Sequence, residues 1–313
     1  LIGLVGSEMC IRDSAKPLHC YSNDSINHFS IAWNDSLFME SWEVKCVSDT
    51  RPPFYEITEV KPLNNATPHA LFIDLGASAS DVWVVNDGYW GIAVTEGQRY
   101  NFQFYLFTEE LKNTVVTAAL LDCEEQIVVS KNFQIERDGS WNHYEGAFTV
   151  DTTANDLRFA LLLPHKGKVY IDFVSMFPEN TFCGHKNGLR EDVAGMLRDL
   201  RPDFVRWPGG CIVEGLTMDN RIKWKETIGD IVKRPGEYNL WGYRSTYGFG
   251  YHEFLQFCED IDADGLFVCN AGMSCLFRNG DYWEEENRID NLIQDALDLS
   301  LIHISEPTRP ISI

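Results

Sequence analysis

Hydrophobic and polar residues alternate with a period of two between about residues 40 and 178, and turn residues recur at short intervals. Within this region Phe102 and Phe104 fall on one side of a stretch, whereas Asn101 and Gln103 fall on the other. Alternation of this kind places successive side chains on opposite faces of a strand, and no helical spacing competes with it. The pattern predicts an antiparallel β-sandwich of about eight short strands.

After Pro178 the hydrophobic period lengthens to that of a helix, and three apolar stripes follow. They comprise Leu189, Val193, Leu197 and Leu200; then Tyr251, Phe254, Leu255, Cys258 and Ile261; then Ile289, Leu292, Ile293, Ala296 and Leu297. We expect Asn187 to cap the first helix and Pro202 to end it. These stripes predict three helices on one side of a boundary near residue 178.

Two stretches between the stripes have the composition of strands, residues 203–207 and residues 266–269. The second is continuously apolar, which predicts a parallel strand that is covered on both faces. The order helix, strand, helix, strand, helix predicts a parallel sheet, either a barrel or a doubly wound sheet. No Gly-x-Gly-x-x-Gly or Walker loop follows either strand, so nucleotide binding has little support.

Composition and charge limit the classes of molecule that this chain is expected to bind. The chain has 313 residues, of which 44% are hydrophobic, which is enough for two domains. Its 47 acidic residues against 26 basic ones give a formal charge of -21, which repels nucleic acids and anionic membranes. No run approaches the roughly 20 apolar residues that cross a bilayer. We therefore expect a neutral substrate, with no nucleic-acid and no membrane partner.

The nine cysteines are scattered and include no Cys-x-x-Cys pair, which argues against a zinc site and against a disulfide scaffold. One acid in the sandwich, Asp172, falls far short of the six to eight or so oxygens that calcium takes. No metal and no cofactor are expected. The compartment stays open, with an extracellular or periplasmic location favoured.

Both ends of the chain look foreign to the rest. Residues 1–14 and 299–313 resemble translated sequencing-adapter read-through, although a short signal-like start and a natural tail would also fit. The expected organisation is therefore a non-native tail at 1–14, a β-sandwich at 15–178, a parallel α/β region at 179–298 and a second tail at 299–313.

Five motifs in order carry a resemblance to a known family. They are Arg206-Trp207-Pro208-Gly209-Gly210-Cys211, Trp224-Lys225-Glu226-Thr227-Ile228-Gly229, Arg234-Pro235-Gly236, Asn239-Leu240-Trp241-Gly242-Tyr243 and Val268-Cys269-Asn270-Ala271-Gly272. Together they resemble the α-L-arabinofuranosidases of glycoside hydrolase family 51 over about residues 60–298. The first half more diffusely resembles the carbohydrate-binding modules of families 4 and 9, which implies that the sandwich is a jelly roll. The resemblance implies that residues 179–298 are the first part of a (β/α)8 barrel.

The same resemblance implies a substrate-binding role for four residues, Arg206, Cys211, Trp241 and Asn270. On spacing alone, Arg206 fits a salt bridge to a helix, Asn270 fits a loop cap and Trp241 fits packing under a long loop. Acidic residues and a histidine nearby are interpreted as structural: Glu214, Glu226, His252 and Glu253. In the sandwich, aromatic residues either stack on sugars or fill the core: Trp83, Tyr89, Trp90 and Trp141.

Family 51 enzymes are retaining, which requires a nucleophilic carboxylate and a general acid about 5 to 5.5 Å apart. The resemblance implies that these glutamates follow the fourth and seventh barrel strands, the acid within an Asn-Glu pair. No Asn-Glu dipeptide occurs in this sequence. We therefore expect a parent enzyme that releases terminal α-L-arabinofuranosyl groups from arabinan or arabinoxylan, and no catalytic residue and no turnover in this chain. The alternatives are a carbohydrate-binding protein without catalysis and a different barrel glycosidase.

Overall fold

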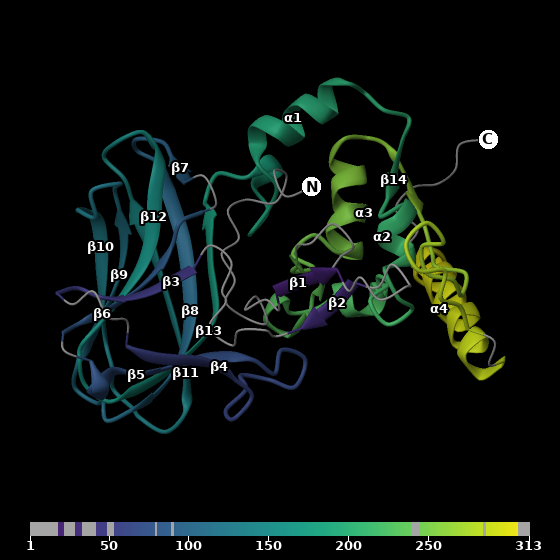
Figure 1. The fold of residues 1–313 in the computed structure, drawn as a ribbon. Helices are drawn as coiled ribbons and strands as arrows, with labels where there is room; N and C mark the ends of the chain where they lie inside the picture. The colour runs from purple at the N-terminus through teal and green to yellow at the C-terminus, as the bar shows by residue number, and fades with distance from the viewer. Residues whose placement is uncertain are drawn as a thin grey trace.

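The computed structural model describes residues 18–21, 29–32, 42–48, 53–78, 80–88, 91–238, 244–283 and 286–305. Most of the regular structure is β, with few helices (Figure 1). Two strands near the start, β1 (Leu18–Tyr21) and β2 (Phe29–Ala32), pair only with each other and belong to neither of the large sheets. Among the described helices, none is both long enough and apolar enough to cross a bilayer.

Two antiparallel sheets account for the first half of the chain. One has six strands in the order β10-β9-β12-β6-β3, with β7 also paired to β12, and the other has five in the order β11-β8-β13-β5-β4. The first comprises β3 (Trp42–Cys46), β6 (Val82–Asn86), β7 (Ile92–Val94), β9 (Val115–Leu121), β10 (Ile127–Gln134) and β12 (Ala154–Leu163). The second comprises β4 (Phe54–Thr58), β5 (Ala70–Asp74), β8 (Arg99–Glu109), β11 (Trp141–Thr149) and β13 (Lys168–Pro178). The antiparallel prediction is confirmed, but about eight strands was too few, because strands of three to five residues show too little alternation to be recognised singly.

Both sheets bury their inward side chains in one continuous core. Burial alternates along β8, where Phe102 and Phe104 are buried between more exposed neighbours. Phe102 stacks on Phe148 of β11 at a centroid distance of 4.2 Å and meets Phe159 of β12 edge-on at 5.9 Å. Each such ring contributes roughly 1.5 to 3 kcal/mol through burial, so the alternation seen in the sequence is the main source of this core's stability.

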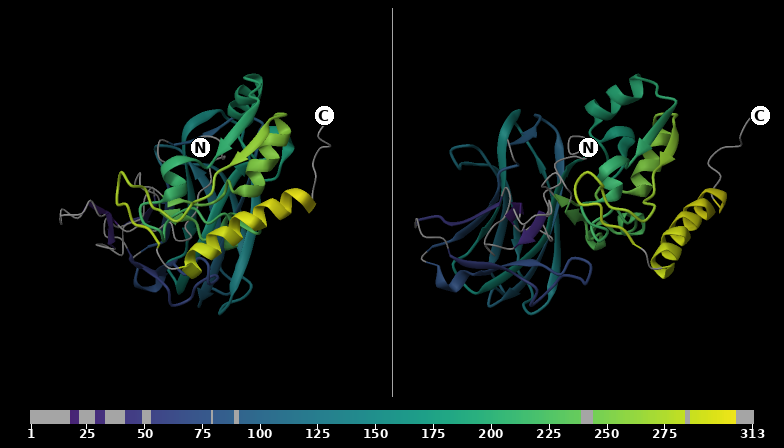
Figure 2. Two further views of the ribbon diagram at one scale, coloured as in Figure 1. Left: turned by 90° about the vertical axis from the view of Figure 1, so that its right-hand side faces the viewer. Right: turned by 45° about the vertical axis from the view of Figure 1, so that its right-hand side comes forward.

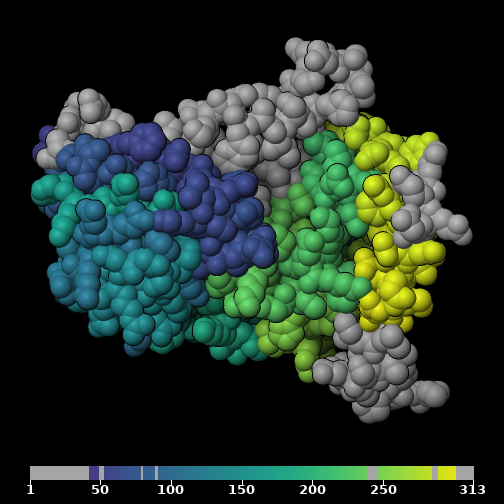
Figure 3. Space-filling view, turned by 90° about the horizontal axis from the view of Figure 1, so that it is seen from below, coloured from purple at the N-terminus to yellow at the C-terminus, as the bar shows by residue number. Residues whose placement is uncertain are grey.

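Strand β13 joins the sheets to the second half. A register shift between Asp172 and Ser175 bends it, and Phe173 packs against Val232 and Leu63 on the outer side of the sheet. The connection from β4 to β5 also reaches across, because the side-chain amide of Asn64 donates to the backbone carbonyl of Val232 at 3.1 Å. Figure 3 shows this blue connection lying against the green second half. Contacts on both sides of β13 explain why it is buried almost throughout.

The second half alternates helices with two short parallel strands, as predicted. Helix α1 (Glu191–Asp199) precedes β14 (Phe204–Trp207), α2 (Gly210–Glu214) and α3 (Tyr251–Asp260), then β17 (Asp264–Phe267) and α4 (Glu286–Ser305) follow. Strands β14 and β17 pair in parallel, with Phe204 beside Asp264 and Trp207 beside Phe267. The other elements of the second half are three 3-10 helices and an antiparallel strand pair: η2 (Phe182–Gly184), η3 (Trp224–Thr227), η4 (Ile231–Lys233), β15 (Glu237–Tyr238) and β16 (Arg244–Ser245). One further 3-10 helix, η1 (Leu75–Ala77), follows β5 in the first half.

The predicted N-cap of α1 is wrong. Arg190 occupies the N-cap position and its side chain makes no capping hydrogen bond, whereas Asn187 has a φ of 54° and lies in the turn before it. A left-handed residue that far upstream cannot accept from the first helical N–H groups. The predicted end is confirmed, because α1 stops at Asp199 and the chain turns through Arg201, at a φ of 50°, into Pro202.

Within the described part of the chain, only one face of the β14–β17 pair is covered. On that face Trp207 stacks on Phe254 of α3 at 5.6 Å, and a Cβ at Gly265 would lie 3.3 Å from the Phe254 ring. On the other face Phe204 is 58% exposed and Leu266 is 50% exposed. The expectation that the second strand is covered on both faces is therefore wrong for this structure, and the strand also begins two residues earlier than predicted.

Helix α4 runs along the outer edge of the second half (Figure 2). It is fastened through the indole N–H of Trp224, which donates to the carbonyl of Asp295 at 3.2 Å, and through the buried side chain of Leu299. The apolar stripe predicted for this helix points largely to solvent, since Ile293 is 53% exposed and Leu297 is 51% exposed. The helix is confirmed, but the predicted packing face is not the one that packs.

Candidate functional site

The carboxyl ends of β14 and β17 bring two loops together. The chain leaves β14 through Pro208 and turns at Gly209 and Gly210, whose φ values of 73° and 51° suit glycine. The turn starts α2 directly, so the first loop folds back over the strand end. A Cβ at Gly209 would lie 3.3 Å from Nη2 of Arg206, which means that the guanidinium lies alongside this glycine.

The second loop, residues 268–283, is fastened to the first by hydrogen bonds from backbone amides. The amide of Cys275 donates to the carbonyl of Gly215 at 3.0 Å, and the amide of Met218 donates to Oδ2 of Asp281 at 3.1 Å. An antiparallel bridge between Met273 and Tyr282 closes the loop on itself. The two loops therefore form one unit at the strand ends, where α/β proteins commonly hold their ligands.

Asn270 organises this unit. Its side-chain amide donates to the carbonyls of Val213 and Met273 at 3.0 and 2.9 Å, and its Oδ1 accepts from the amides of Gly272 and Met273 at 2.6 and 3.2 Å. The structure thus gives Asn270 the contacts of the loop-capping alternative, and its direct role in substrate binding stays a prediction.

Arg206 is exposed on the uncovered face of β14, beside the apolar side chains of Phe204 and Leu266. Among the described residues no carboxylate forms an ion pair with it, so the salt bridge considered as an alternative is not formed there. A guanidinium in this setting is available to a planar acceptor or to sugar hydroxyls.

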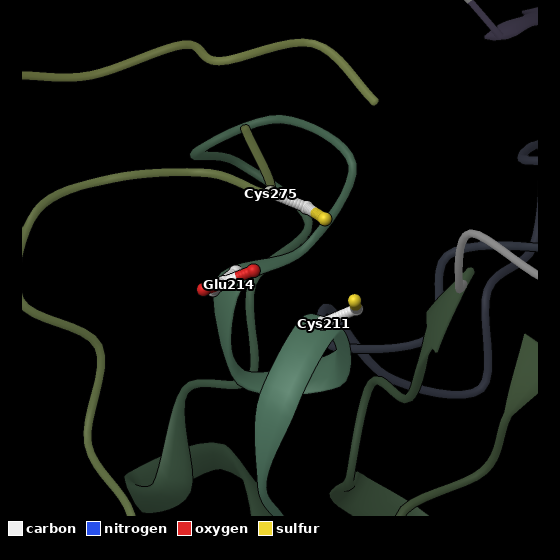
Figure 4. Close-up of side chains that lie close together, drawn as sticks. All are labelled: Cys211, Glu214 and Cys275. Atoms are coloured by element: carbon white, nitrogen blue, oxygen red, sulfur yellow. The ribbon is translucent and has the colours of Figure 1, made fainter. Parts of the chain in front are cut away.

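Cys211 of α2 lies close to two other potential ligands (Figure 4). Its Sγ, the Sγ of Cys275 and a carboxylate oxygen of Glu214 all lie within 4.8 Å of one another. Burial, together with hydrogen bonds to Cys211 and Glu214, raises the pKa of the Cys275 thiol to about 11. The sequence analysis missed this cluster because Cys275 comes from the second loop, and neither periodicity nor motif spacing links it to Cys211.

The remaining aromatic predictions fall elsewhere. Trp241, Tyr89 and Trp90 lie outside the described residues. Trp83 packs against the outer apolar cluster of the six-stranded sheet, and the indole N–H of Trp141 donates to the carbonyl of Pro62 at 3.1 Å. Both described tryptophans therefore make structural contacts, whether or not they also meet a sugar.

Several motif residues stabilise the scaffold instead of facing the strand ends. Arg234 is buried and forms a two-pronged ion pair with Glu253 of α3, with N–O distances of 2.9 and 3.0 Å. Thr227 Oγ1 accepts from the amide of Tyr251 at 3.0 Å and so satisfies the start of α3. The structural interpretation of Glu253 agrees with this geometry.

A cavity of about 390 Å³ lies on the side of α3 that faces away from the strands. Its lining includes His185, Glu253 and Asp260, and Nε2 of His185 lies 2.8 Å from Oδ2 of Asp260. Of the predicted substrate-binding residues that the structure describes, Arg206, Cys211 and Asn270, none lines this cavity.

Comparison with known proteins gives one consistent family. The family model described as Alpha-L-arabinofuranosidase 1 domain matches residues 196–309. An extracellular exo-alpha-L-arabinofuranosidase of Streptomyces chartreusis is 34% identical over 240 residues, covering 73% of this chain and 28% of that protein. Alpha-L-arabinofuranosidase 1 of Arabidopsis thaliana is 34% identical over 225 residues, covering 71% of this chain and 32% of that protein. The chain thus spans about a third of the length of these relatives.

A solved structure supports the fold. The arabinose-bound structure of a glycoside hydrolase family 51 α-L-arabinofuranosidase superposes with a TM-score of 0.77 and 24% sequence identity. The superposition covers 95% of this chain and 45% of that one. The sequence relatives, the matched domain and this structure together show that the chain belongs to the α-L-arabinofuranosidases of glycoside hydrolase family 51.

Proposed function

We propose that this chain carries the sugar-binding loops of a retaining glycosidase that releases terminal α-L-arabinofuranosyl groups from arabinan or arabinoxylan. In this proposal residues 15–178 are a jelly-roll module like those that bind carbohydrate. Residues 179–298 are the first part of a (β/α)8 barrel, with β14 and β17 as its first two described strands.

The observation that carries the proposal is the position of Arg206. It lies at the carboxyl end of β14, on the face opposite α3. In a barrel the helices cover the outside, so the face without helices turns to the interior, and active sites lie at the carboxyl ends of the strands. The uncovered face is therefore the interior face of the proposed barrel, and Arg206 points from it at the site end.

The proposal gives each of the four residues a role that suits the chemistry of its side chain. The fixed fork of donors on Arg206 suits paired hydroxyls or a carboxylate. Cys211 supplies a small wall and a weak donor, Trp241 an apolar face for the ring, and Asn270 holds the second loop in position. No cofactor is needed for this role, and nucleic acids and membranes are not partners.

The chain binds without cleaving in this proposal, because no Asn-Glu pair supplies the general acid. Purified chain incubated with an aryl α-L-arabinofuranoside should release no nitrophenol above the uncatalysed rate. Release at an enzymatic rate that survives further purification would refute this half of the proposal.

The binding half is tested separately by calorimetry or ligand-observed NMR with L-arabinose and arabino-oligosaccharides. Arg206→Ala should abolish the response, whereas Arg198→Ala, which removes an exposed arginine of α1, should leave it unchanged. An equal response from wild type and Arg206→Ala would contradict the assignment of Arg206.

A second candidate, a sugar-binding protein without catalysis, is favoured by an aromatic row on the outer face of the five-stranded sheet. The row comprises Phe54, Phe72, Tyr170, Phe107 and Trp141, with neighbouring ring centroids 4.8 to 6.2 Å apart. Its end at Phe54 is exposed, and flat aromatic faces suit the apolar side of a sugar ring. Under this candidate Phe54→Ala weakens binding of soluble arabinoxylan and Arg206→Ala does not.

A further inference from the structure

The cluster of Cys211, Glu214 and Cys275 has the composition of a metal site. Cys211 and Glu214 are three residues apart on α2 and so share one side of the helix, and Cys275 approaches from the second loop. Figure 4 shows the two sulfur atoms and a carboxylate oxygen bordering the same space between the helix and the loop. Two thiols and a carboxylate converge here from two segments that are far apart in the sequence.

We propose that this cluster binds a thiophilic divalent cation, with Zn²⁺ as the physiological class and Cd²⁺ as its spectroscopic analogue. Zn²⁺ takes thiolates at about 2.3 Å and carboxylate oxygens at about 2.0 to 2.2 Å in a tetrahedral arrangement. Ligand atoms in such a site lie roughly 3.5 to 4 Å apart. The separations here reach at most 4.8 Å, so an adjustment of about 1 Å completes the site.

The scaffold around the cluster is already fixed. The amide of Cys275 donates to the carbonyl of Gly215, the residue that follows α2, and the side chain of Asn270 donates to the carbonyl of Val213 within α2. These bonds hold the second loop against the helix from both sides of the cluster. A site whose ligands come from bonded segments needs little ordering when the metal arrives.

In the proposed site three protein ligands leave the fourth tetrahedral position of the ion to a small ligand. Cys275 is 2% exposed, while Cys211 and Glu214 are only partly buried. Three protein ligands with an accessible fourth position is the arrangement in which zinc also holds water or another small ligand. Binding converts the two thiols to thiolates and releases two protons, with no change of oxidation state.

A consequence that rests on the proposed function follows for sugar binding. Cys211 is one of the residues proposed to border the arabinofuranose, so occupancy by Zn²⁺ and by the sugar should exclude each other. The metal site itself does not depend on that proposal, because it is tested by metal binding alone.

The test titrates the purified, metal-stripped full chain with Zn²⁺ against a chromophoric chelator, and with Cd²⁺ while thiolate-to-metal absorbance is followed. We expect one equivalent bound with the absorbance of two thiolates. Cys211→Ser should weaken Zn²⁺ binding by more than the roughly 10- to 100-fold that loss of an outer-sphere partner costs, and Cys275→Ser should do the same. Glu214→Gln should weaken binding while preserving the Cd²⁺–thiolate absorbance.

Cys269→Ser is the matched control, because Cys269 is a free cysteine on the same loop but outside the cluster. It should bind Zn²⁺ like the wild type. If Cys275→Ser fails to fold, Cys211→Ser and Glu214→Gln still decide the question, since both residues are partly exposed. Binding that survives Cys211→Ser undiminished, or that Cys269→Ser weakens as much, would overturn the proposal. Zn²⁺ binding with no effect of arabinose on it would leave the metal site standing and count against the sugar role of Cys211.

Discussion

Removing the guanidinium of Arg234 should destabilise the second half of the protein more than removing the exposed charge of Lys225. The side chain is 6% exposed and is held on three sides. It meets both carboxylate oxygens of Glu253 and donates to the carbonyls of Gly229 at 2.9 Å and Tyr247 at 2.8 Å. Arg234→Met keeps much of the apolar stem and leaves all three acceptors without this donor.

The size of the effect follows from burial. Breaking a buried ion pair by removing one partner costs about 3 to 5 kcal/mol, because the remaining charge is left uncompensated. Glu253 is 27% exposed and can be rehydrated in part, so the lower end of that range is expected. Glu253→Gln retains an acceptor for the amide of Gly250, which donates to Oε2 at 2.9 Å, and should cost only about 1 to 3 kcal/mol.

Urea denaturation followed by tryptophan fluorescence measures the loss of unfolding free energy. Because a chain of this length need not unfold in one step, hydrogen exchange of the α3 amides shows whether the loss lies in that helix. Lys225→Ala is the control, because it removes exposed ion pairs with Asp295 and Asp298 and should cost less than about 1 kcal/mol. If Arg234→Met lost no more than Lys225→Ala, and α3 kept its protection, the inference that this ion pair fixes α3 would be wrong.

Three further changes test other parts of the second half. Gly250→Ala places a Cβ 1.9 Å from the carbonyl oxygen of Thr227 and should lower the free energy of unfolding by at least the roughly 1 to 3 kcal/mol of an overpacked site. Urea denaturation measures this, and an unchanged midpoint would contradict the geometry. Burial and the charge of Asp264 raise the pKa of the Cys258 thiol to about 11. The folded state therefore favours the neutral thiol, and the stability that this preference contributes is full below pH 9 and is lost as the pH rises to about 11. In Cys258→Ala the free energy of unfolding should fall between pH 9 and about pH 11 by less than in the wild type, with a difference on the order of 2 kcal/mol. An equally large fall would exclude Cys258 as its source. The exposed apolar face of α4 should promote self-association of the chain, because exposed apolar patches favour contact between molecules. Ile293→Lys should therefore reduce association in sedimentation without changing the helical signal, and equal association would show that this face is not responsible.

Local patterns predicted the elements well where each element depends on its own residues. Alternation along β8 matched its burial, and the stripe from Tyr251 to Cys258 faces the core as expected. Errors arose where pairing overrides local sequence. Strand β17 starts at Asp264, because its amide donates to the carbonyl of Asp203 and extends the parallel pairing into polar residues. The sequence has no apolar run at these residues from which the start of the strand could be predicted.

The candidate site was predicted only in part, and for a similar reason. The motif around Arg206 and Cys211 located the first loop, and Asn270 located the second. The contact between Cys211 and Cys275 depends on how the two loops are hydrogen-bonded, which a single sequence does not encode in any spacing. The motif at Arg234 was informative about the family, yet its arginine serves the scaffold through Glu253. A family motif thus shows that a residue matters, but not whether it stabilises the fold or contacts the substrate.

The uncovered face of β14 and β17 also bears on the proposed function. Phe204 and Leu266 expose apolar surface on both sides of a charged Arg206, a combination that is unfavourable as a permanent solvent face. If other strands of the proposed barrel cover that face, the apolar side chains gain from burial, but a guanidinium without an acceptor would cost several kcal/mol. Whatever covers the face must therefore bring a carboxylate or a set of hydroxyls to Arg206. Under the proposed function a retaining glycosidase supplies both, a catalytic carboxylate and a bound sugar, so the proposal accounts for a guanidinium in the interior of the proposed barrel.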